Sequence, residues 1–499
     1  MSRIVDCFDE ACRNYRERCA LMEFGRRSAR RVSFEDLKRD VDRVCAALVQ
    51  KGVKRGERVV LFVSPSYELL VFLIACLKLG ASLMIIDLWA GKGLIRQTFR
   101  EYRADYIAVS GKTKLIRLAF GELRKIKALI RVDKLFANRE KAGREGQESA
   151  EALTNAPRRP MPEIPEQDVA VLTMTTGSTG RSKIVLRSHR DLYRQLELVR
   201  SNMDERKGET IALNTSFMYH FVNILNGYSG ILLPAESRAL LAMLGKNKRR
   251  RTQELPAQVL FSSPDFCLET ELRFPALEEL YFGGAILNLY EAEKIRKKFP
   301  QAKITYIYGA TECNLICKTN LDDYIQSLRE GRTVLGEAVK GVRIKTDENR
   351  EIMVHADVVL ADYLNPEQRR GEVDEEGRYW HRTGDLGRIE DGTLVYLGRR
   401  DVFVRGTQED FCSNEIEQAV VRRFSGLKKC ACFYHRDKNY LFVEGDPCSE
   451  GELRDFAKAW GLGEDLVITR LHKIPCDAKH HSKIDYNHLK RLAERRNRV

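Results

Sequence analysis

Short apolar runs alternate with amphipathic segments in the N-terminal part of the chain, and this alternation limits the fold more than any other feature. Residues 33–50 open with a Ser-x-x-Asp cap and carry apolar residues at helical spacing. Residues 67–79 repeat the helical pattern, whereas residues 59–63, 82–86 and 106–109 are short apolar runs typical of buried strands. Helices that alternate with buried strands pack as layers on a mainly parallel sheet. The sequence therefore predicts an α/β fold.

The pattern continues and then changes near Gly398. Further strand-like runs occur at 259–261, 279–282 and 304–307, and polar or glycine-rich residues follow each of them. Strand ends of this kind line the ligand crevice of open α/β sheets. Beyond Gly398 we expect a compact α+β module with helices at 414–424 and 450–460 and strands at 431–434 and 440–443.

The charge balance favours anionic partners. The chain has 499 residues, of which 31% are charged, and its formal net charge is +14. Such a balance suits nucleotides, acidic carrier proteins or membrane surfaces. The densest basic cluster, residues 246–251, has no aromatic residues interleaved with it. We interpret it as a solvated loop or helix end and expect no nucleic-acid partner.

Cysteine usage and the lack of long apolar segments indicate a cytoplasmic protein. The 13 cysteines are scattered and form no pairs with the spacing of metal ligands. Free thiols in this number fit a reducing compartment better than a secreted scaffold. The N-terminus has no apolar signal segment, and no stretch is long enough to predict a transmembrane helix.

Residues 171–185, VLTMTTGSTGRSKIV, have the composition of an anion-binding loop. An apolar run leads into a dense set of hydroxyls and glycines followed by a lysine: Thr175, Thr176, Gly177, Ser178, Thr179, Gly180 and Lys183. Glycines let the backbone approach a phosphate closely, hydroxyls and N–H groups donate to its oxygens, and lysine adds positive charge. The spacing differs from that of a Walker A loop. A flexible surface loop is the alternative interpretation of this segment alone.

Five further motifs follow this loop in a fixed order. They are Gly283-Gly284-Ala285, Tyr308-Gly309-Ala310-Thr311-Glu312, His381-Arg382-Thr383-Gly384-Asp385, Gly398-Arg399-Arg400-Asp401 and Ser482-Lys483-Ile484-Asp485. Each is weak alone, but an ordered set is far more specific. In this order and spacing the chain resembles the adenylate-forming superfamily of acyl-CoA synthetases, peptide-synthetase adenylation domains and luciferase-like ligases. The resemblance extends from about Ser33 to Lys483.

The resemblance implies two domains and ATP chemistry. Residues 1–400 would form a large multi-sheet α/β domain that binds ATP and the acyl substrate. Residues 401–499 would form a small mobile α+β domain that carries the catalytic lysine. A carboxylate would attack the α-phosphate of ATP, so that pyrophosphate leaves and an acyl-adenylate forms. This reaction needs charge neutralisation and positioning more than acid–base catalysis.

The resemblance also assigns roles to individual residues. The loop Thr175–Lys183 would hold the β- and γ-phosphates, Thr311 would contact the α-phosphate and Glu312 would hold Mg²⁺. Tyr308 and Gly309 would lie beside adenine with Gly283–Ala285. Asp385 would bind the ribose hydroxyls with Arg399 close by. Lys483 would bridge the carboxylate and the α-phosphate, and Asp401 would be the hinge of the small domain.

The acyl pocket is expected near His220, in the segment SFMYHFVNILNG. Many relatives place an aromatic residue or a histidine there, although His220 could equally be a core residue. Phe217, Phe221 and Val222 make the neighbourhood apolar, which favours a fatty or aryl acid over an amino acid.

Two departures concern the second half-reaction. Gln408 and Asp410 stand where relatives carry glycine and arginine, and glutamine would narrow the approach of a pantetheine thiol. The ending PCDAKHHSKI at 475–484 resembles that of β-lactone synthetases, which adenylate a β-hydroxy acid and need no CoA.

Three functions therefore stay open. The first is an AMP-forming ligase that transfers a hydrophobic acid to CoA or to the phosphopantetheine of an acidic acyl carrier protein. The second is a β-lactone synthetase or another adenylate-only ligase. The third is a non-catalytic acyl- or nucleotide-binding protein, which the presence of Glu312, Asp385 and Lys483 disfavours.

Overall fold

A computed structural model defines the architecture. It describes residues 2–24, 29–86, 92–111, 116, 120–136, 162–175, 183–206, 208–217, 219–233, 254–360, 362–446, 448–463, 465–477 and 483–496. The chain divides into two compact units. Unit 1 comprises Met1–Gln258, Glu271–Pro275 and Leu360–Arg369, and unit 2 comprises Val259–Thr270, Ala276–Val359 and Arg370–Val499. The predicted division into domains 1–400 and 401–499 is not the division into these two units, and it stays a prediction.

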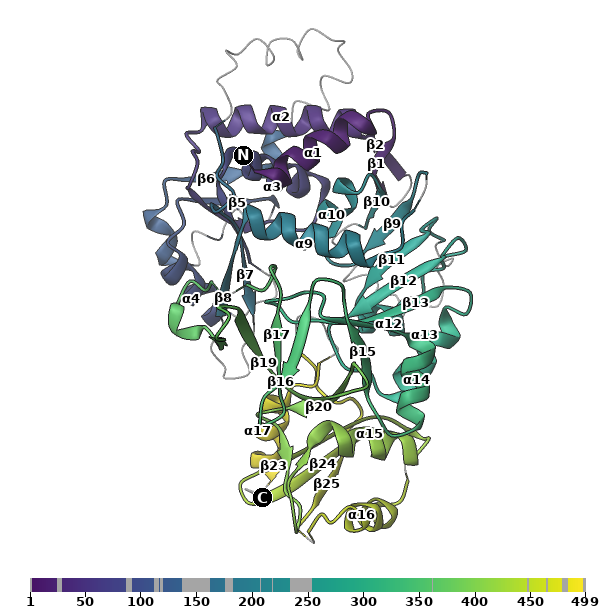
Figure 1. Cartoon of the computed structure of the whole chain (residues 1–499). Coiled ribbons are helices and arrows are strands. Elements are labelled where there is room, and N and C mark those ends of the chain that lie inside the picture. The colour runs from purple at the N-terminus through teal and green to yellow at the C-terminus, as the bar shows by residue number, and fades with distance from the viewer. Residues whose placement is uncertain are drawn as a thin grey trace. The chain divides into compact units, whose positions relative to one another are not determined.

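Unit 1 contains one six-stranded sheet and four strands of a larger sheet, with helices packed around them (Figure 1). Its helices are α1 (Arg3–Asn14), α2 (Phe34–Gln50), α3 (Tyr67–Leu79), α4 (Lys92–Tyr102), η2 (Gly121–Lys125), α6 (Val132–Leu135), α9 (His189–Asn202), α10 (Tyr219–Leu225) and η3 (Pro366–Gln368). One sheet has the order β6 (Ala128–Arg131), β5 (Tyr106–Val109), β3 (Arg58–Phe62), β4 (Ser82–Ile85), β7 (Val169–Thr175) and β8 (Lys183–Ser188). The other contains β9 (Ile211–Asn214), β10 (Ser229–Leu232), β1 (Cys19–Phe24) and β2 (Ala29–Ser33).

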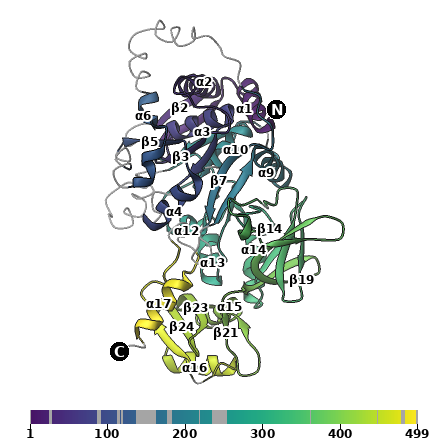
Figure 2. The ribbon, with the colours of Figure 1, turned by 90° about the vertical axis from the view of Figure 1, so that its left-hand side faces the viewer.

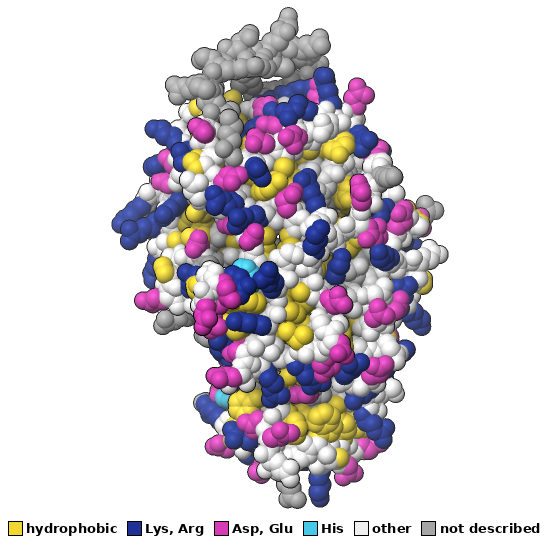
Figure 3. All heavy atoms as spheres, viewed as in Figure 1, with side chains coloured by type: hydrophobic (Ala, Val, Ile, Leu, Met, Phe, Trp, Pro, Cys, Tyr) yellow, Lys and Arg dark blue, Asp and Glu magenta, His cyan; other side chains and the backbone are white. Residues whose placement is uncertain are grey.

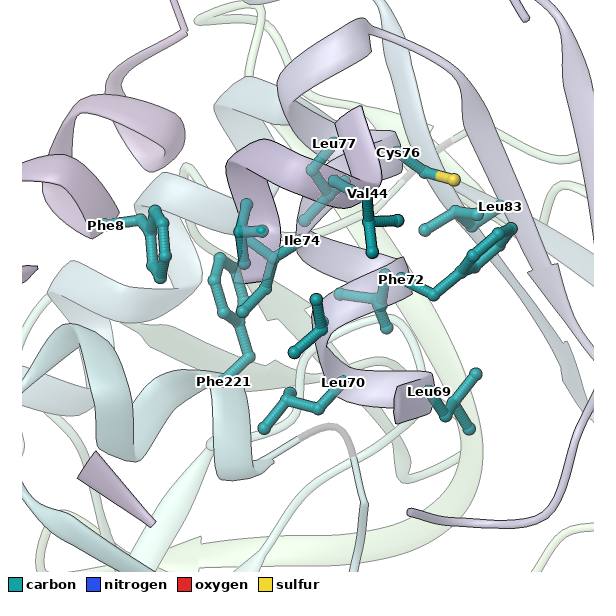
Figure 4. Packing of buried hydrophobic residues seen from close by; sticks show 14 of the residues in the cluster. Phe8, Val44, Leu69, Leu70, Phe72, Ile74, Cys76, Leu77, Leu83 and Phe221 are labelled. Carbon is teal, nitrogen blue, oxygen red and sulfur yellow. The ribbon is translucent and has the colours of Figure 1, made fainter. Parts of the chain in front are cut away.

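Helix α3 lies at the centre of the core of unit 1. Every residue from Leu69 to Leu79 is buried. Figure 4 shows how these side chains pack with Phe8 of α1 and Phe221 of α10. The helix begins after Ser66, whose side chain accepts from the N–H of Leu69, and ends at Gly80, which is left-handed. The ammonium group of buried Lys78 pairs with Asp9 at 2.8 Å, as a buried charge requires.

Unit 2 contains a long mixed sheet. Its order is β16 (Arg343–Thr346), β17 (Glu351–His355), β19 (Tyr379–Glu390), β20 (Thr393–Arg399), β15 (Val334–Ala338), β14 (Cys317–Asn320), β13 (Lys303–Tyr308), β12 (Glu279–Gly283) and β11 (Val259–Ser262), with β18 (Gly371–Val373) on β19. The accompanying helices are α12 (Pro264–Glu269), α13 (Leu289–Lys298) and α14 (Leu321–Arg329). Strands β11, β12 and β13 are parallel, so their carboxyl ends meet at one edge.

The last part of unit 2 is an α+β module (Figure 2). It contains β21 (Phe403–Val404), β22 (Phe411–Cys412), α15 (Ser413–Arg423), β23 (Leu427–His435), β24 (Lys438–Gly445), α16 (Glu450–Ala459), β25 (Val467–Arg470) and α17 (Tyr486–Arg496). Alternate residues of β23 enter two cores. Cys430 and Cys432 pack with α15 and α16, whereas Ala431 and Phe433 pack with α17. The predicted α/β fold class is thus confirmed, and so is the predicted α+β character of this segment.

Candidate functional site

The carboxyl ends of β12 and β13 bring two of the predicted motifs together in unit 2. The strands pair in parallel with Gly283 opposite Ile307. A Cβ on Gly283 would lie 2.2 Å from the carbonyl oxygen of Ile307, so no other residue fits there. Gly284 has a φ of +102°, a conformation that favours glycine. Glycine at 283 is thus required by the close approach of β13, at the residue before Tyr308.

Both carboxylate oxygens of Asp385 accept hydrogen bonds. It lies on β19 and is 8% exposed. The hydroxyl of Tyr308 donates to its Oδ2 at 2.7 Å, and the guanidinium of Arg399, which is opposite it on β20, donates to its Oδ1 at 2.6 Å. Burial, and then the nearby carboxylate, raise the pKa of Tyr308 well above its usual range, so the phenol keeps its proton.

A second buried residue, Glu351 of β17, holds the backbone beside Asp385. Its carboxylate is 2% exposed and accepts from the N–H of Gly384 at 2.9 Å. It also accepts from Arg370 at 2.8 Å and from Arg400 at 3.1 Å. Sequence analysis missed Glu351, because no motif includes it and its partners are distant along the chain.

A tight turn after β13 carries Thr311 and Glu312. The N–H of Ala310 donates to the carbonyl of Cys313 at 2.8 Å, and a Cβ on Gly309 would lie 2.2 Å from the carbonyl oxygen of Asn314. Glu312 is 8% exposed, and its Oε2 lies 3.6 Å from Nε2 of His381, a β19 residue with no predicted role. No cluster of three metal-ligating side chains occurs among the described residues. Glu312 offers the carboxylate oxygens that Mg²⁺ prefers, and phosphate oxygens would have to complete the coordination.

Lys483 lies close enough to these groups to interact with them electrostatically. Its N–H donates to Oδ1 of Asp477 at 3.0 Å, and its carbonyl accepts from the N–H of Asp477 at 2.8 Å. The residue as a whole is exposed, yet the surrounding protein lowers the pKa of the ammonium group, chiefly by desolvation. The carboxylates of Asp385 and Glu312 act in the opposite direction. The ammonium group therefore lies in the same electrostatic environment as Asp385 and Glu312.

A cavity of about 500 Å³ adjoins this region of unit 2. Ala285, of the glycine-containing turn, and Cys476, which forms an isolated bridge with Ile484 beside Lys483, both line it. Glu291 of α13 and Lys429 of β23 form a 2.8 Å ion pair in its wall. The cavity thus lies between the turn and the segment that carries the lysine.

The predicted phosphate loop lies mostly outside the described residues. This applies to Thr176, Gly177, Ser178, Thr179 and Gly180, and also to the side chain of Thr175. Lys183 opens β8 in unit 1, and its ammonium nitrogen lies 5.7 Å from the centre of the Tyr363 ring. The basic cluster at 246–251 and residues 478–482 of the C-terminal motif also lie outside the described residues.

His220 lies on α10 in unit 1 and is 2% exposed. Its ring packs edge-on against Phe217, with 6.0 Å between the ring centroids. Phe221, the next residue, packs in the core of unit 1 with Phe8 (Figure 4).

The residues predicted for the second half-reaction are exposed. Asp401 lies 3.5 Å from the guanidinium of Arg400. Gln408 lies in the loop between β21 and β22, and Asp410 pairs with Arg405 at 3.2 Å. The roles predicted for all three stay predictions.

On the face drawn in Figure 3, basic and acidic side chains are interspersed. Across the described residues, no helix combines the length and apolarity needed to cross a membrane.

Comparisons with known proteins give a consistent result. Residues 8–359 match the model of the family described as "AMP-binding enzyme". The chain is 24% identical over 446 residues to surfactin synthase subunit 1 of Bacillus subtilis (strain 168), covering 82% of this chain but only 12% of that protein. It is 24% identical over 408 residues to the D-alanine--D-alanyl carrier protein ligase of Streptococcus pneumoniae, covering 75% of this chain and 73% of the relative. The solved anthranilate CoA ligase AuaEII, in complex with anthranoyl-AMP, has the same fold, with a TM-score of 0.78, 17% identity and coverage of 99% and 98%.

Proposed function

The chain belongs to the AMP-binding enzyme family, and from this premise we propose that it activates a carboxylic acid with ATP and then transfers the acyl group to a thiol. In the first step a carboxylate oxygen attacks the α-phosphorus, the bond to the bridging oxygen breaks, and pyrophosphate leaves. The products are an acyl-adenylate and pyrophosphate. In the second step a thiolate of CoA or of a carrier-protein phosphopantetheine attacks the acyl carbon and AMP leaves.

One observation carries this proposal. Asp385 is held by Tyr308 and Arg399, and Lys483 shares an electrostatic environment with Asp385 and Glu312. A carboxylate with both oxygens already oriented can accept the two ribose hydroxyls of a nucleotide without reorganising. A nearby ammonium group can neutralise the charge that develops when a carboxylate meets a phosphate. Glu312 would hold Mg²⁺, which would neutralise charge on the departing pyrophosphate.

The proposal that a thiol accepts the acyl group rests on the similar proteins. One relative is a D-alanyl carrier protein ligase and one solved structure with the same fold is a CoA ligase, so a thiol acceptor is the simplest proposal. The net charge of +14 would favour an acidic carrier. The acyl part is proposed to be largely apolar, fatty or aryl, as the sequence near His220 suggests.

Gln408 supports a second candidate. This exposed glutamine stands where relatives carry glycine, and its side chain would narrow the path of a pantetheine thiol. An adenylate-only ligase, such as a β-lactone synthetase, uses no pantetheine thiol and would tolerate a glutamine there.

The test is ATP-dependent pyrophosphate release across fatty, hydroxy, aryl and amino acids, each with and without CoA or a phosphopantetheinylated carrier. Mass spectrometry would identify the acyl product. An acyl thioester supports the first candidate, and pyrophosphate release with a lactone or free adenylate supports the second. No release with any acid would overturn both.

A further inference from the structure

Strand β19 bulges where it carries Asp385. Between Glu351 and Met353 of β17 the antiparallel register shifts, so that residues 383–385 of β19 face a single residue of β17. The middle residue of the bulge, Gly384, has a φ of +81°, a conformation that favours glycine. A β-bulge redirects the side chains beside it, so this bulge determines where the carboxylate of Asp385 lies.

The side chain of Glu351 holds the bulge from the β17 side. Its Oε1 accepts from the N–H of Gly384 at 2.9 Å. Thr383 holds the other end, because its hydroxyl donates to the carbonyl of Ile352 at 2.9 Å and accepts from the N–H of Asp385 at 3.1 Å. Side chains thus satisfy the backbone N–H groups of both Gly384 and Asp385.

Arginines fix the Glu351 carboxylate in one orientation. Glu351 is 2% exposed, and a buried carboxylate needs charged or polar partners. Its Oε1 also accepts from Arg370 at 2.8 Å, and its Oε2 accepts from Arg400 at 3.1 Å and from Arg382 at 3.4 Å. Hydrogen bonds between guanidinium and carboxylate groups are among the strongest in proteins. The acceptor for the N–H of Gly384 is therefore in place before any nucleotide binds.

A displaced bulge would disturb the candidate ribose site. The bulge places Asp385 2.7 Å from the hydroxyl of Tyr308 and 2.6 Å from the guanidinium of Arg399. Bonds from a bound ribose to the same carboxylate would weaken steeply if their geometry departed from the optimum. A misplacement of about 1 Å can lower a rate by about 100-fold. Glu351 therefore affects nucleotide binding through the backbone of Gly384.

We propose that Glu351 is a positioning residue for the nucleotide: it holds the N–H of Gly384, fixes the bulge and thereby aims Asp385 at the two ribose hydroxyls. The preference of the enzyme for ribonucleotides over nucleotides without these hydroxyls then depends on Glu351. This inference rests on the proposed function and adds to it a residue that acts through another.

The test compares nucleotides that differ only in the ribose hydroxyls. Isothermal titration without any acid would give Kd for AMP and 2′,3′-dideoxy-AMP, and pyrophosphate exchange would give kcat/KM for the two matching triphosphates. We expect wild-type protein to prefer the ribonucleotide by on the order of 100-fold. Glu351→Gln should lower this preference to about tenfold, because it weakens binding of AMP and leaves binding of dideoxy-AMP nearly unchanged.

A second variant disturbs the bulge from its other end. Thr383→Val keeps the shape of the side chain but removes its bonds to Ile352 and Asp385. It should reduce the preference for AMP in the same way although Glu351 is unchanged, because both side chains hold the same backbone. This variant decides the question if Glu351→Gln does not fold, and an unchanged preference in it would then overturn the inference.

The matched control is Asp40→Asn on α2 in unit 1. Asp40 is also a buried carboxylate, 3% exposed, and it accepts from the hydroxyl of Tyr67 at 2.7 Å and from Arg43 at 3.3 Å. The change from carboxylate to amide should lower the Tm and keep the preference for AMP.

The outcomes separate this inference from the proposed function. A wild-type preference in Glu351→Gln, or equal weakening of AMP and dideoxy-AMP, would overturn the inference and leave adenylation standing. The same follows if Asp40→Asn loses the preference to the same extent, since lower stability alone would then explain the loss. No pyrophosphate exchange by wild-type protein with any acid would overturn the proposed function itself.

Discussion

Buried polar side chains in the two units differ in whether they have hydrogen-bond partners. In unit 2 both carboxylate oxygens of Asp385 are bonded, and Glu351 beside it has several donors. In unit 1 the amide of Asn214 has no partner among the described residues. A cluster that supplies its own partners is ordered before a ligand arrives, whereas one that lacks them stays unfavourable until a ligand supplies them. The first arrangement is preorganised for a ligand, whereas the second costs free energy of folding.

The largest expected effect comes from Lys483 in unit 2. Lys483→Ala should lower the rate of pyrophosphate exchange by about 10²–10³-fold, because it removes charge neutralisation in the transition state. Stopped exchange assays at saturating ATP would measure it. Lys458→Ala, an exposed lysine on α16, is the matched control and should keep full activity. Near-normal exchange in Lys483→Ala would contradict the assigned role.

Glu417 shows that a buried carboxylate can remain unfavourable in its charged form even when it accepts hydrogen bonds. It accepts from the N–H of Cys432 and the hydroxyl of Tyr486, yet burial raises its pKa to about 7. The folded state therefore binds the proton more tightly than the unfolded state, and the stability that this supplies is lost as pH rises from about 4.5 to 7.

Glu417→Gln should remove this pH dependence and stabilise the protein above pH 7 by up to about 3 kcal/mol. Urea unfolding between pH 4 and pH 8.5 would measure it, with Glu415→Gln on the same helix as a control. Parallel pH curves for wild type and Glu417→Gln would rule out the assigned titration.

Asp385→Asn and Asn214→Leu should move stability in opposite directions. The first removes a charged acceptor from Arg399 and Tyr308. It should weaken ATP binding by about 10–100-fold and lower the Tm of the free protein. The second removes unpaired buried atoms and should leave the Tm unchanged or raise it. Isothermal titration with a non-hydrolysable ATP analogue would measure binding, and calorimetric melting would measure the Tm of both variants. A lower Tm in Asn214→Leu than in wild type would contradict the idea that its buried amide lacks partners.

Tyr308→Phe has the smallest expected effect. It keeps the ring beside the Gly283–Ala285 turn but removes the hydrogen bond to Asp385, so KM for ATP should rise by roughly fivefold, about 1 kcal/mol. Tyr324→Phe, which removes a bond from another buried tyrosine to the carbonyl of Leu287, is the control. Equal KM values for Tyr308→Phe and wild type would show that the bond does not position Asp385.

The sequence predicted elements best where local signals determine them. Helix α3 was predicted with its observed bounds from its helical pattern, and in the structure Ser66 caps its start and the left-handed Gly80 ends it. Strand β23 was predicted only at 431–434, because its pairing with β24 extends it to Leu427–His435 through polar residues such as Lys428 and Lys429. Backbone pairing, unlike hydrophobicity, leaves no periodic signal in the sequence.

The candidate site divides in the same way. Tyr308, Asp385 and Arg399 stand in ordered motifs, so the resemblance could assign them roles from the sequence alone. Glu351 and Asn214 stand in no motif. Their importance depends on which groups lie opposite them after folding, and that is decided by contacts between distant segments.

The length of β19 has a mechanical consequence. The strand carries His381, which lies beside Glu312, and Asp385, which lies beside Tyr308. A single strand paired on both sides is stiff, so a shift along its axis would move both residues together. The surroundings of Glu312, the candidate for Mg²⁺, and of Asp385, the candidate for ribose, therefore depend on the same strand. A mutation that makes β19 less rigid would disturb both positions at once.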